Sequence, residues 1–263
     1  MGSTRDMRAA SRSERMNVRA VFFDLFDTLV RFDRDRLPEV TIAGRIVRST
    51  AGHLHPILRT WKPDVTLETF HKALQESWQE AERRRAIDHR EVAAPERFAY
   101  LFRCLALDPD RCPPGLLQNL LDTHRRELSK AAEFPAHHGP LLTDLARRYR
   151  VALVSNFDYT PTALGILREA GVADLFDTIV VSDEIGWRKP APAIFEEALR
   201  RVGVTADQTL FVGDRPDIDV LGAHQVGMRT AWINPDAAPL PPGIPKPDVE
   251  LRDLGDLRPV LGI

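Results

Sequence analysis

Four polar side chains that could take part in hydrolytic chemistry each come shortly after an apolar run of the sequence. They are Asp24, Ser155, Lys189 and Asp214. Carboxylates, a hydroxyl and an ammonium that converge would suit a phosphate group together with a hard divalent cation. Each residue alone is an ordinary turn former or loop charge, but their recurrence at four such positions favours a shared site.

The stretch after the last of these runs is crowded with acids. It reads Gly213-Asp214-Arg215-Pro216-Asp217-Ile218-Asp219, with three carboxylates within six residues. Like charges so close together repel one another unless a cation compensates them. The pattern therefore favours a compensating cation near this loop.

Short β-type runs alternate with helical stretches after residue 135, and this alternation supplies the elements that could position the four residues. The runs lie at 151–155, 178–182, 209–212 and 230–233, the helical stretches at 161–170, 191–202 and 217–226, and a last short element at 249–251 precedes a terminal helix. Such alternation predicts βαβ units and a parallel sheet. The strand at 18–23 must join this sheet, so the polar residues would meet at its carboxyl edge, where ligands bind in open α/β sheets.

The long segment at 34–132 has a helical rhythm instead. Apolar residues recur there at steps of three and four, as at Leu67, Phe70 and Leu74, and no strand-like alternation interrupts them. We therefore expect an all-helical cap domain inserted after the first strand. The predicted organisation is a tail at 1–17, an α/β core at 18–33 and 133–263, and a helical cap at 34–132.

The composition is that of an ordinary globular protein, with 263 residues, 43% hydrophobic and 28% charged residues and a formal net charge of −2. This balance gives no electrostatic basis for binding nucleic acid or a membrane surface. The polar, Arg/Ser-rich first 17 residues lack the apolar region of a secretory signal. Cys104 and Cys112 are expected to be reduced thiols of a cytoplasmic protein. The sequence does not indicate an oligomeric state.

The same residues resemble the motifs of the haloacid dehalogenase-like (HAD) hydrolases. Asp24-Leu25-Phe26-Asp27-Thr28-Leu29 is similar to the family's first motif, Asp-x-Asp-x-Thr-Leu, and Ser155 to its second. Lys189-Pro190 is similar to the third motif, and Gly213-Asp214 with Asp219 to the fourth. The helical insertion resembles the family's C1-type cap. The resemblance implies a Rossmann-like parallel sheet core.

The resemblance also implies a Mg²⁺-dependent hydrolase of a small phosphorylated substrate. Asp24 would be the nucleophile and would form an aspartyl-phosphate. Mg²⁺ would be bound by the carboxylates of Asp24 and Asp214 and by the main-chain carbonyl of Phe26. Asp219 would bind the metal through water or pair with Lys189.

Four side chains would contact the phosphoryl group. Ser155 and Lys189 would hold its oxygens and offset charge in the transition state, and Thr28 and Asn156 would add further contacts. The choice of substrate would fall to the cap, whose sequence names no substrate.

Phe26 stands where the family's phosphatases carry an acid that protonates the leaving group. Loss of a positioned acid typically costs about 10²–10⁴-fold in rate. The chain could be a phosphatase that uses an easy leaving group, such as an aryl or acyl phosphate, or Asp27 as a replacement acid. It could also resemble the 2-haloacid dehalogenases, which carry an aromatic residue here, or be a catalytically weak phosphate-binding relative. The acids Asp214 and Asp219 have no use in a metal-free site, so they favour the phosphatase.

Three further features are interpreted outside the reaction. Arg83-Arg84-Arg85 lies among glutamates and is interpreted as a solvated helix face. His137 and His138 lack an acid or cysteine companion at a recognisable zinc-site spacing, and we interpret them as helix-end residues. Trp187 and Arg188 could contact the cap or the substrate, or serve in packing.

Overall fold

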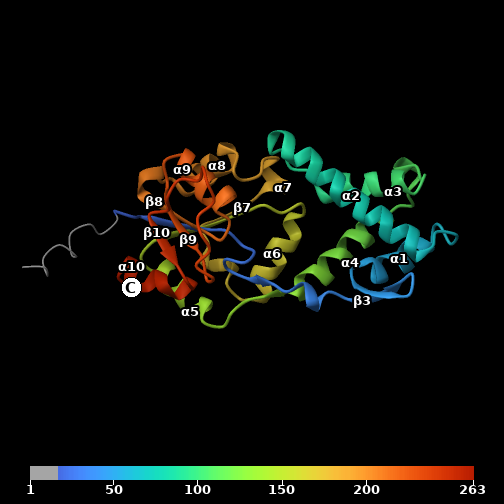
Figure 1. The fold of residues 1–263 in the computed structure, drawn as a ribbon, viewed down its shortest axis with the longest axis horizontal. Helices are drawn as coiled ribbons and strands as arrows, with labels where there is room; N and C mark the ends of the chain where they lie inside the picture. The colour runs from blue at the N-terminus through green and yellow to red at the C-terminus, as the bar shows by residue number, and fades with distance from the viewer. Residues whose placement is uncertain (1–16) are drawn as a thin grey trace, which may run out of the picture.

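The computed structural model describes residues 17–263, and a six-stranded sheet forms the centre of its larger part (Figure 1). All the pairings in this sheet are parallel, in the order β10–β9–β8–β1–β6–β7. The strands are β1 (Ala20–Phe23), β6 (Arg150–Ser155), β7 (Thr178–Val181), β8 (Thr209–Gly213), β9 (Arg229–Ile233) and β10 (Val249–Leu251). The predicted parallel α/β core is confirmed. The predicted tail lies outside the described residues except for Asn17.

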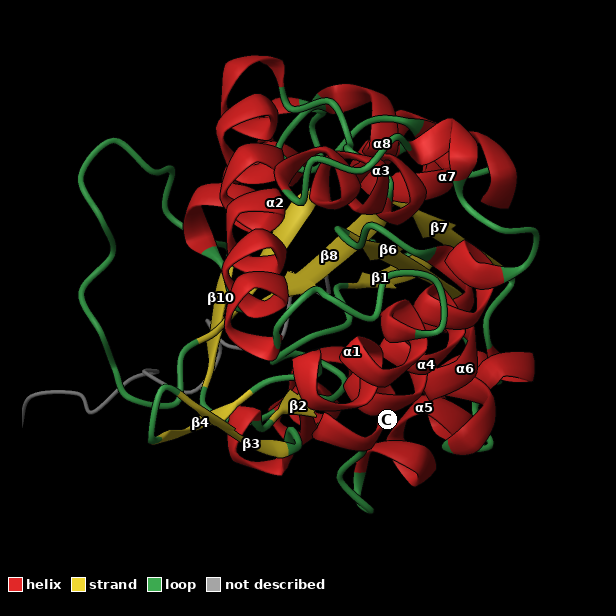
Figure 2. Cartoon of the chain, turned by 90° about the vertical axis from the view of Figure 1, so that its right-hand side faces the viewer, coloured by secondary structure: helices red, strands yellow, loops and turns green. Residues whose placement is uncertain are grey.

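Helices cover both faces of the sheet, as Figure 2 shows from a second side. They are α5 (His138–Ala146), α6 (Thr160–Glu169), α7 (Ser182–Ile185), α8 (Pro192–Val202), α9 (Leu221–Gln225) and α10 (Leu257–Leu261). A π-helix, η5 (Pro216–Val220), runs directly into α9, so the helix expected at 217–226 is present in two parts. Helices α5, α6 and α10 pack on one face, and α8 and α9 pack on the other.

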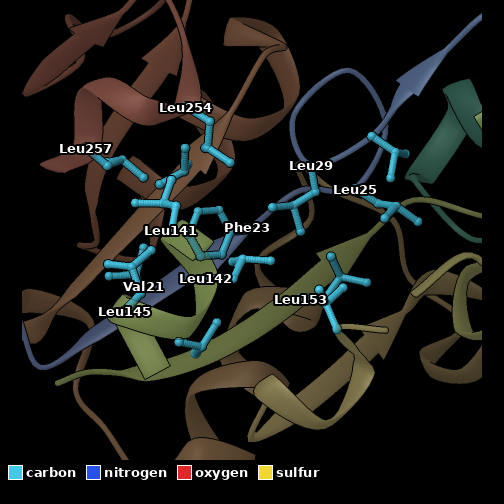
Figure 3. Close-up of a cluster of buried hydrophobic side chains, with 14 of the residues drawn as sticks. Val21, Phe23, Leu25, Leu29, Leu141, Leu142, Leu145, Leu153, Leu254 and Leu257 are labelled. Atoms are coloured by element: carbon cyan, nitrogen blue, oxygen red, sulfur yellow. The ribbon is translucent and has the colours of Figure 1, made fainter. Parts of the chain in front are cut away.

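The strand β1 lies in the middle of the sheet, and its side chains are all apolar and fully buried. Parallel strands buried on both faces read as continuous apolar runs, as this one does. Val21 and Phe23 belong to the cluster with α5 and α6, shown in Figure 3, whereas Ala20 and Phe22 belong to the opposite cluster. Truncating a buried Phe typically costs about 3–5 kcal/mol, so packing on both faces holds the strand that leads into Asp24.

A second part of the molecule is built around its own apolar cluster, which includes Phe70, Phe98 and Phe102. Its helices are α1 (Ala51–Arg59), α2 (Leu67–Asp88), α3 (Ala94–Cys104) and α4 (Leu116–Ala131). The apolar stripes at helical spacing were correctly predicted to form helices. This second part contains Cys104 and Cys112, and both are free thiols.

The expectation of an all-helical insertion is wrong in one respect. The strands β3 (Glu39–Ile42) and β4 (Arg45–Arg48) form an antiparallel hairpin within it. The turn residues Ala43 and Gly44 have φ values of +48° and +75°, the left-handed conformation that two-residue hairpin turns require. Each strand has only four residues, too few for their alternation to stand out beside the long helical stripes.

The chain crosses between the two parts through a short antiparallel ribbon. Its strands are β2 (Arg31–Phe32) and β5 (Ala132–Glu133), which pair with each other. The expected domain limit at 33/34 falls just after β2 and that at 132/133 falls within β5, and both limits stay a prediction. Within residues 17–263, no helix is long and apolar enough to cross a membrane.

Candidate active site

The register of the central strands brings the predicted site residues to one edge of the sheet. Phe23 of β1 lies opposite Leu153 of β6 and Val212 of β8. Asp24 is the next residue after Phe23, and its main-chain N–H donates to Val212 O at 2.9 Å. Ser155 and Asp214 each stand two residues beyond those partners, so all three emerge at the carboxyl edge.

A tight turn after β1 orients the loop that carries Asp24. The carbonyl of Leu25 accepts hydrogen bonds from the main-chain N–H groups of Leu29 and Val30, both at 2.9 Å. Asp27 closes the turn with φ at +58°, and its exposed carboxylate accepts from Phe32 N at 3.1 Å. This hydrogen bond ties one oxygen of the Asp27 carboxylate to the turn, although Asp27 also lines the cavity beside Phe26.

Within the described residues, Lys189 is the one lysine whose ammonium contacts the acids at this edge of the sheet. Its side chain is 1% exposed, and Nζ lies 2.5 Å from Asp24 Oδ1 and 2.8 Å from Asp219 Oδ1. Asn156 fixes the Lys189 main chain, because its Oδ1 accepts from Lys189 N at 2.7 Å and its Nδ2 donates to Lys189 O at 2.9 Å. Both ends of the Asn156 amide are thus engaged, and this side chain positions Lys189 rather than facing a substrate.

The carboxylates of Asp24, Asp214 and Asp219, which we call the acid cluster, each offer an oxygen within 4.8 Å of the others. Burial, with repulsion from Asp219, raises the pKa of Asp24 to about 6 although Lys189 opposes the rise. Burial, with repulsion from Asp24 and Asp219, raises the pKa of Asp214 to about 8. Three carboxylates against one ammonium leave two uncompensated negative charges when all are ionised. This set of oxygens fits a divalent cation such as Mg²⁺.

Close backbone packing fixes the acid cluster. A Cβ at Gly213 would lie 2.3 Å from Asp219 Oδ2, so only glycine fits beside that carboxylate. Asp219 also accepts from Arg215 N at 3.0 Å. The indole N–H of Trp232 donates to Asp214 O at 2.9 Å, and Thr28 Oγ1 donates to Asp214 Oδ1 at 3.4 Å. These contacts hold the acids together before any ligand arrives.

Ser155 presents a hydroxyl with no protein partner. The residue is fully buried at the end of β6, and its Oγ makes no hydrogen bond within residues 17–263. A buried polar group without a partner costs about 1–3 kcal/mol. A phosphoryl oxygen bound at this edge would satisfy it.

A cavity of about 770 Å³ opens between the two parts of the molecule beside the loop that carries Asp24. Its aromatic wall includes Phe26, whose ring lies 5.5 Å from that of Phe32 and 5.0 Å from that of Phe157. Its other side chains include Leu74, Trp78, Arg34, Arg48, Arg85, Arg97, His124, Asp158 and Arg188. The leaving group of a substrate at Asp24 would therefore meet aromatic rings where the family's phosphatases have an acid.

Salt bridges along this cavity join the helical part of the molecule to the sheet part. We call them the junction network, formed by Glu82, Arg85, Glu91, Arg97, Asp158 and Arg188. Arg97 Nε donates to Asp158 Oδ2 at 2.8 Å, and Arg188 Nη1 donates to Glu91 Oε2 at 2.6 Å. Ser182 Oγ also donates to Glu91. Although burial opposes it, Arg97 and Arg85 hold the pKa of Asp158 below its usual value.

His124 completes this junction as a neutral residue. Burial and the charge of Arg97 lower its pKa to about 3. Its Nε2 lies 3.3 Å from Arg97 Nη2 and its Nδ1 lies 2.9 Å from Thr50 Oγ1. Because a guanidinium only donates hydrogen bonds, Nε2 must be the acceptor and Nδ1 must carry the proton.

The main chain reinforces the junction beside Lys189. Glu91 N donates to Gly186 O at 3.0 Å, and Arg188 N donates to His89 O at 2.8 Å. The Arg90 guanidinium stacks on the Trp187 ring at 4.6 Å. The sequence left the roles of Trp187 and Arg188 open. In the structure, both residues contact the inserted segment. The loop that carries Lys189 is pinned from the helical side.

The prediction for Arg83-Arg84-Arg85 is wrong for its third member. Arg83 and Arg84 are on the surface and pair with nearby glutamates, as expected. Arg85 has a side chain that is only 7% exposed and donates to Glu82, Glu91 and the Val92 carbonyl. The helix turns this one position inward, where Asp158 of the sheet part also lies 3.6 Å from its guanidinium.

A profile of the haloacid dehalogenase-like hydrolases matches residues 18–227, which is most of the chain. The chain belongs to this family. It is 30% identical to a glyceraldehyde 3-phosphate phosphatase of Pyrococcus abyssi over 82% of this chain and 81% of that protein. It is 40% identical to a phosphoserine phosphatase of Thermus thermophilus over 59% of this chain and 60% of that protein.

Solved structures of HAD hydrolases share the fold. A 2-haloacid dehalogenase from Pseudomonas syringae superposes with a TM-score of 0.65 and 24% identity, covering 93% of this chain and 98% of that one. At that identity the likeness concerns the fold, and the chemistry must be argued from the residues of the site.

Sequence reasoning located the edge of the sheet but not everything around it. Asp24, Thr28, Lys189, Asp214 and Asp219 come together there through hydrogen bonds, ion pairs or short separations. Ser155 and Phe26 emerge beside them, whereas Asn156 turns to the main chain. The junction network was missed, because its partners Arg97 and Asp158 are 61 positions apart and form no local motif.

Proposed function

We propose that this HAD hydrolase is a Mg²⁺-dependent phosphatase that acts on a small phosphorylated metabolite. The observation that carries the proposal is the acid cluster, whose three carboxylates face only one ammonium and are matched to a divalent cation. The phosphatase names of the relatives from Pyrococcus abyssi and Thermus thermophilus support it. The charge balance gives no electrostatic basis for nucleic-acid or membrane binding, which supports a small-molecule substrate, and a cytoplasmic location stays a prediction.

Asp24 is the nucleophile in this proposal. A carboxylate oxygen of Asp24 attacks phosphorus, and the bond to the leaving oxygen breaks with its electron pair remaining on that oxygen. Water then attacks the aspartyl-phosphate, releasing phosphate and restoring the Asp24 carboxylate. Lys189 holds Asp24 in place and, with the Ser155 hydroxyl, donates to the phosphoryl oxygens. Thr28 steadies Asp214, because its hydroxyl donates to Asp214 Oδ1.

The metal would be held by Asp24, Asp214 and the Phe26 main-chain carbonyl. When bound, Mg²⁺ neutralises charge on the acids and on the phosphoryl oxygens. Because position 26 supplies only its carbonyl, a phenylalanine there is compatible with metal binding. Asp219 contacts Lys189 at 2.8 Å and serves as its partner.

Phe26 restricts the leaving group. The phenylalanine ring has no proton to give to the departing oxygen, and the carboxylate of Asp27 accepts a hydrogen bond from Phe32 N. Leaving groups that are stable as anions, such as phenolates and carboxylates, depart without a proton. We infer that the substrate is an ester or anhydride of this kind, with the aromatic wall of the cavity beside its leaving group.

Haloacid dehalogenation is the second candidate, favoured by the aromatic residue at position 26, because halide departs without a proton. The charge of the acid cluster opposes it. A haloacid carries its own carboxylate, which would approach two uncompensated negative charges unless a cation intervened.

The decisive experiment compares two substrates with and without a chelator. We expect hydrolysis of p-nitrophenyl phosphate in Mg²⁺, loss of that activity in EDTA, and no chloride release from 2-chloropropionate. Chloride release that EDTA leaves unchanged would replace the phosphatase with the dehalogenase. Phosphate binding without turnover of either substrate would identify a catalytically weak relative.

A further inference from the structure

A second cluster of metal-ligating groups lies where the start of α5 meets the segment that follows β10. His137 and His138 stand at the start of α5, and Asp253 precedes the 3₁₀ turn η6 (Leu254–Asp256). Figure 1 shows α5 beside the C-terminal helix that follows this turn, and Arg258 of that helix pairs with Asp144 of α5 at 2.8 Å. The two segments therefore meet in a stable way.

The three residues converge closely enough to share one ion. His137 Nε2 lies 3.1 and 3.2 Å from the two Asp253 carboxylate oxygens, and the rings of His137 and His138 are 4.4 Å apart. One ligand atom from each residue lies within 4.8 Å of the others. Two ligands about 2.1 Å from a tetrahedral ion are roughly 3.4 Å apart, close to the separation of His137 from Asp253.

His138 is prepared to act as a ligand. Its Nδ1 lies 2.9 Å from the main-chain carbonyl of Leu29, and since a carbonyl only accepts, Nδ1 must carry the proton. The lone pair is then on Nε2. The ring is buried, packs edge-on against Phe134 and keeps a lowered pKa, chiefly because of burial. A metal-binding histidine almost always donates its other N–H to a carbonyl or carboxylate, as His138 does.

Asp253 is prepared as well. Its Oδ1 accepts from Gly255 N at 2.8 Å, which orients the carboxylate. Although burial opposes it, this bond and the neighbouring His137 hold the pKa of Asp253 below its usual value. The carboxylate therefore stays ionised and keeps lone pairs for an ion.

We propose that His137, His138 and Asp253 form a binding site for a divalent transition metal of the zinc class, separate from the acid cluster. Imidazole nitrogens suit Zn²⁺, Cu²⁺ and Ni²⁺, whereas the all-oxygen acid cluster suits Mg²⁺. Water completes the coordination. The bound ion ties the start of α5 to the segment that leads into the C-terminal helix.

Zn²⁺ and Co²⁺ titrations of the tag-free, EDTA-stripped full chain test this site, with excess Mg²⁺ present to fill the acid cluster. We expect one equivalent of Zn²⁺ to bind by calorimetry, ligand-field absorption from bound Co²⁺, and a melting temperature raised by roughly 5 °C at a hundredfold excess over Kd. His137→Ala and Asp253→Asn should each weaken binding at least about tenfold. His137 is exposed and Asp253 is half-buried, and asparagine can keep the hydrogen bond to Gly255 N, so circular dichroism should show both variants folded.

Two control variants separate this site from others. His224→Ala removes an exposed histidine elsewhere on the surface and should leave Zn²⁺ affinity unchanged. Asp214→Asn disrupts the acid cluster and should also leave it unchanged. The proposal would be overturned if the wild-type protein bound Zn²⁺ no more strongly than folded Asp253→Asn protein. Loss of Zn²⁺ binding in Asp214→Asn would also overturn it.

Discussion

The acid cluster and the junction network are both buried groups of charges, but only one of them is balanced. The acid cluster has three carboxylates and one ammonium. The junction network has three carboxylates and three guanidinium groups. The same chemical group responds in opposite ways, because the pKa of Asp214 is raised whereas that of Asp158 is lowered. The charges of the junction network balance one another, whereas the acid cluster has an excess of negative charge that a bound cation would neutralise.

The largest expected effect separates function from stability in the acid cluster. Asp24→Asn removes the nucleophile, so the kcat for p-nitrophenyl phosphate should fall at least about 10⁴-fold. The melting temperature should not fall, because one repelling charge is gone. Asp217→Asn is the matched control, since Asp217 is exposed and pairs with Arg215 on the same loop. Undiminished turnover in Asp24→Asn would remove Asp24 from the reaction.

The junction network should respond in the opposite way to loss of a charge. Arg97→Met leaves Asp158 and His124 without their main partner in a buried place, and urea unfolding should show a loss of about 3–5 kcal/mol. The control Arg83→Met removes an exposed arginine and should change the unfolding free energy by no more than about 0.5 kcal/mol. Equal stability of the two variants would contradict the contrast between the two clusters.

The pH dependence of stability should identify His124 in the junction. Its pKa falls from 6.5 to about 3 on folding, so below pH 6.5 the unfolded chain binds a proton that the folded chain refuses. The stability contributed above pH 6.5 is therefore lost as the pH falls toward 3. In excess Mg²⁺ we expect a loss of about 2 kcal/mol between pH 7.5 and pH 5 from this group. His124→Gln should flatten the profile and His224→Gln should not.

The smallest expected effect concerns Phe26, the aromatic residue two positions after Asp24. Phe26→Asp restores an acid beside Asp24, so hydrolysis of an alkyl phosphate should rise about tenfold or more. Hydrolysis of p-nitrophenyl phosphate should change less, because its leaving group needs no proton. Phe26→Ala should raise neither rate. A gain equal for both substrates would show that Phe26 does not limit protonation.

The positions of Asp24, Ser155 and Asp214 could be predicted from the sequence because each follows a buried parallel strand. Such strands are continuous apolar runs, and their carboxyl ends must meet whatever the details of packing. The contacts of Asn156 could not be predicted, because an amide after a strand can face a ligand or the main chain equally well. The short hairpin at 39–48 was also missed, since a reversal of so few residues depends on the turn at Ala43 and Gly44.

Contacts between residues that lie far apart in the chain could not be predicted from the sequence either, because they depend on how the chain folds. Arg188 and Glu91 are 97 positions apart, and His137 and Asp253 are 116 apart. Neither pair has a fixed spacing that could mark it. Arg85 looked like its solvated neighbours, since only the folded structure shows which of the three arginines is turned inward.

The most direct test of the central claim is the Mg²⁺ affinity of the acid cluster, measured by calorimetry in wild type, Asp214→Asn and Asp217→Asn. The charge balance predicts one Mg²⁺ per chain in wild type and in Asp217→Asn, an affinity at least about tenfold weaker in Asp214→Asn, and phosphatase activity that saturates with the bound ion. Equal Mg²⁺ affinity in all three proteins, or full phosphatase activity in EDTA, would contradict it.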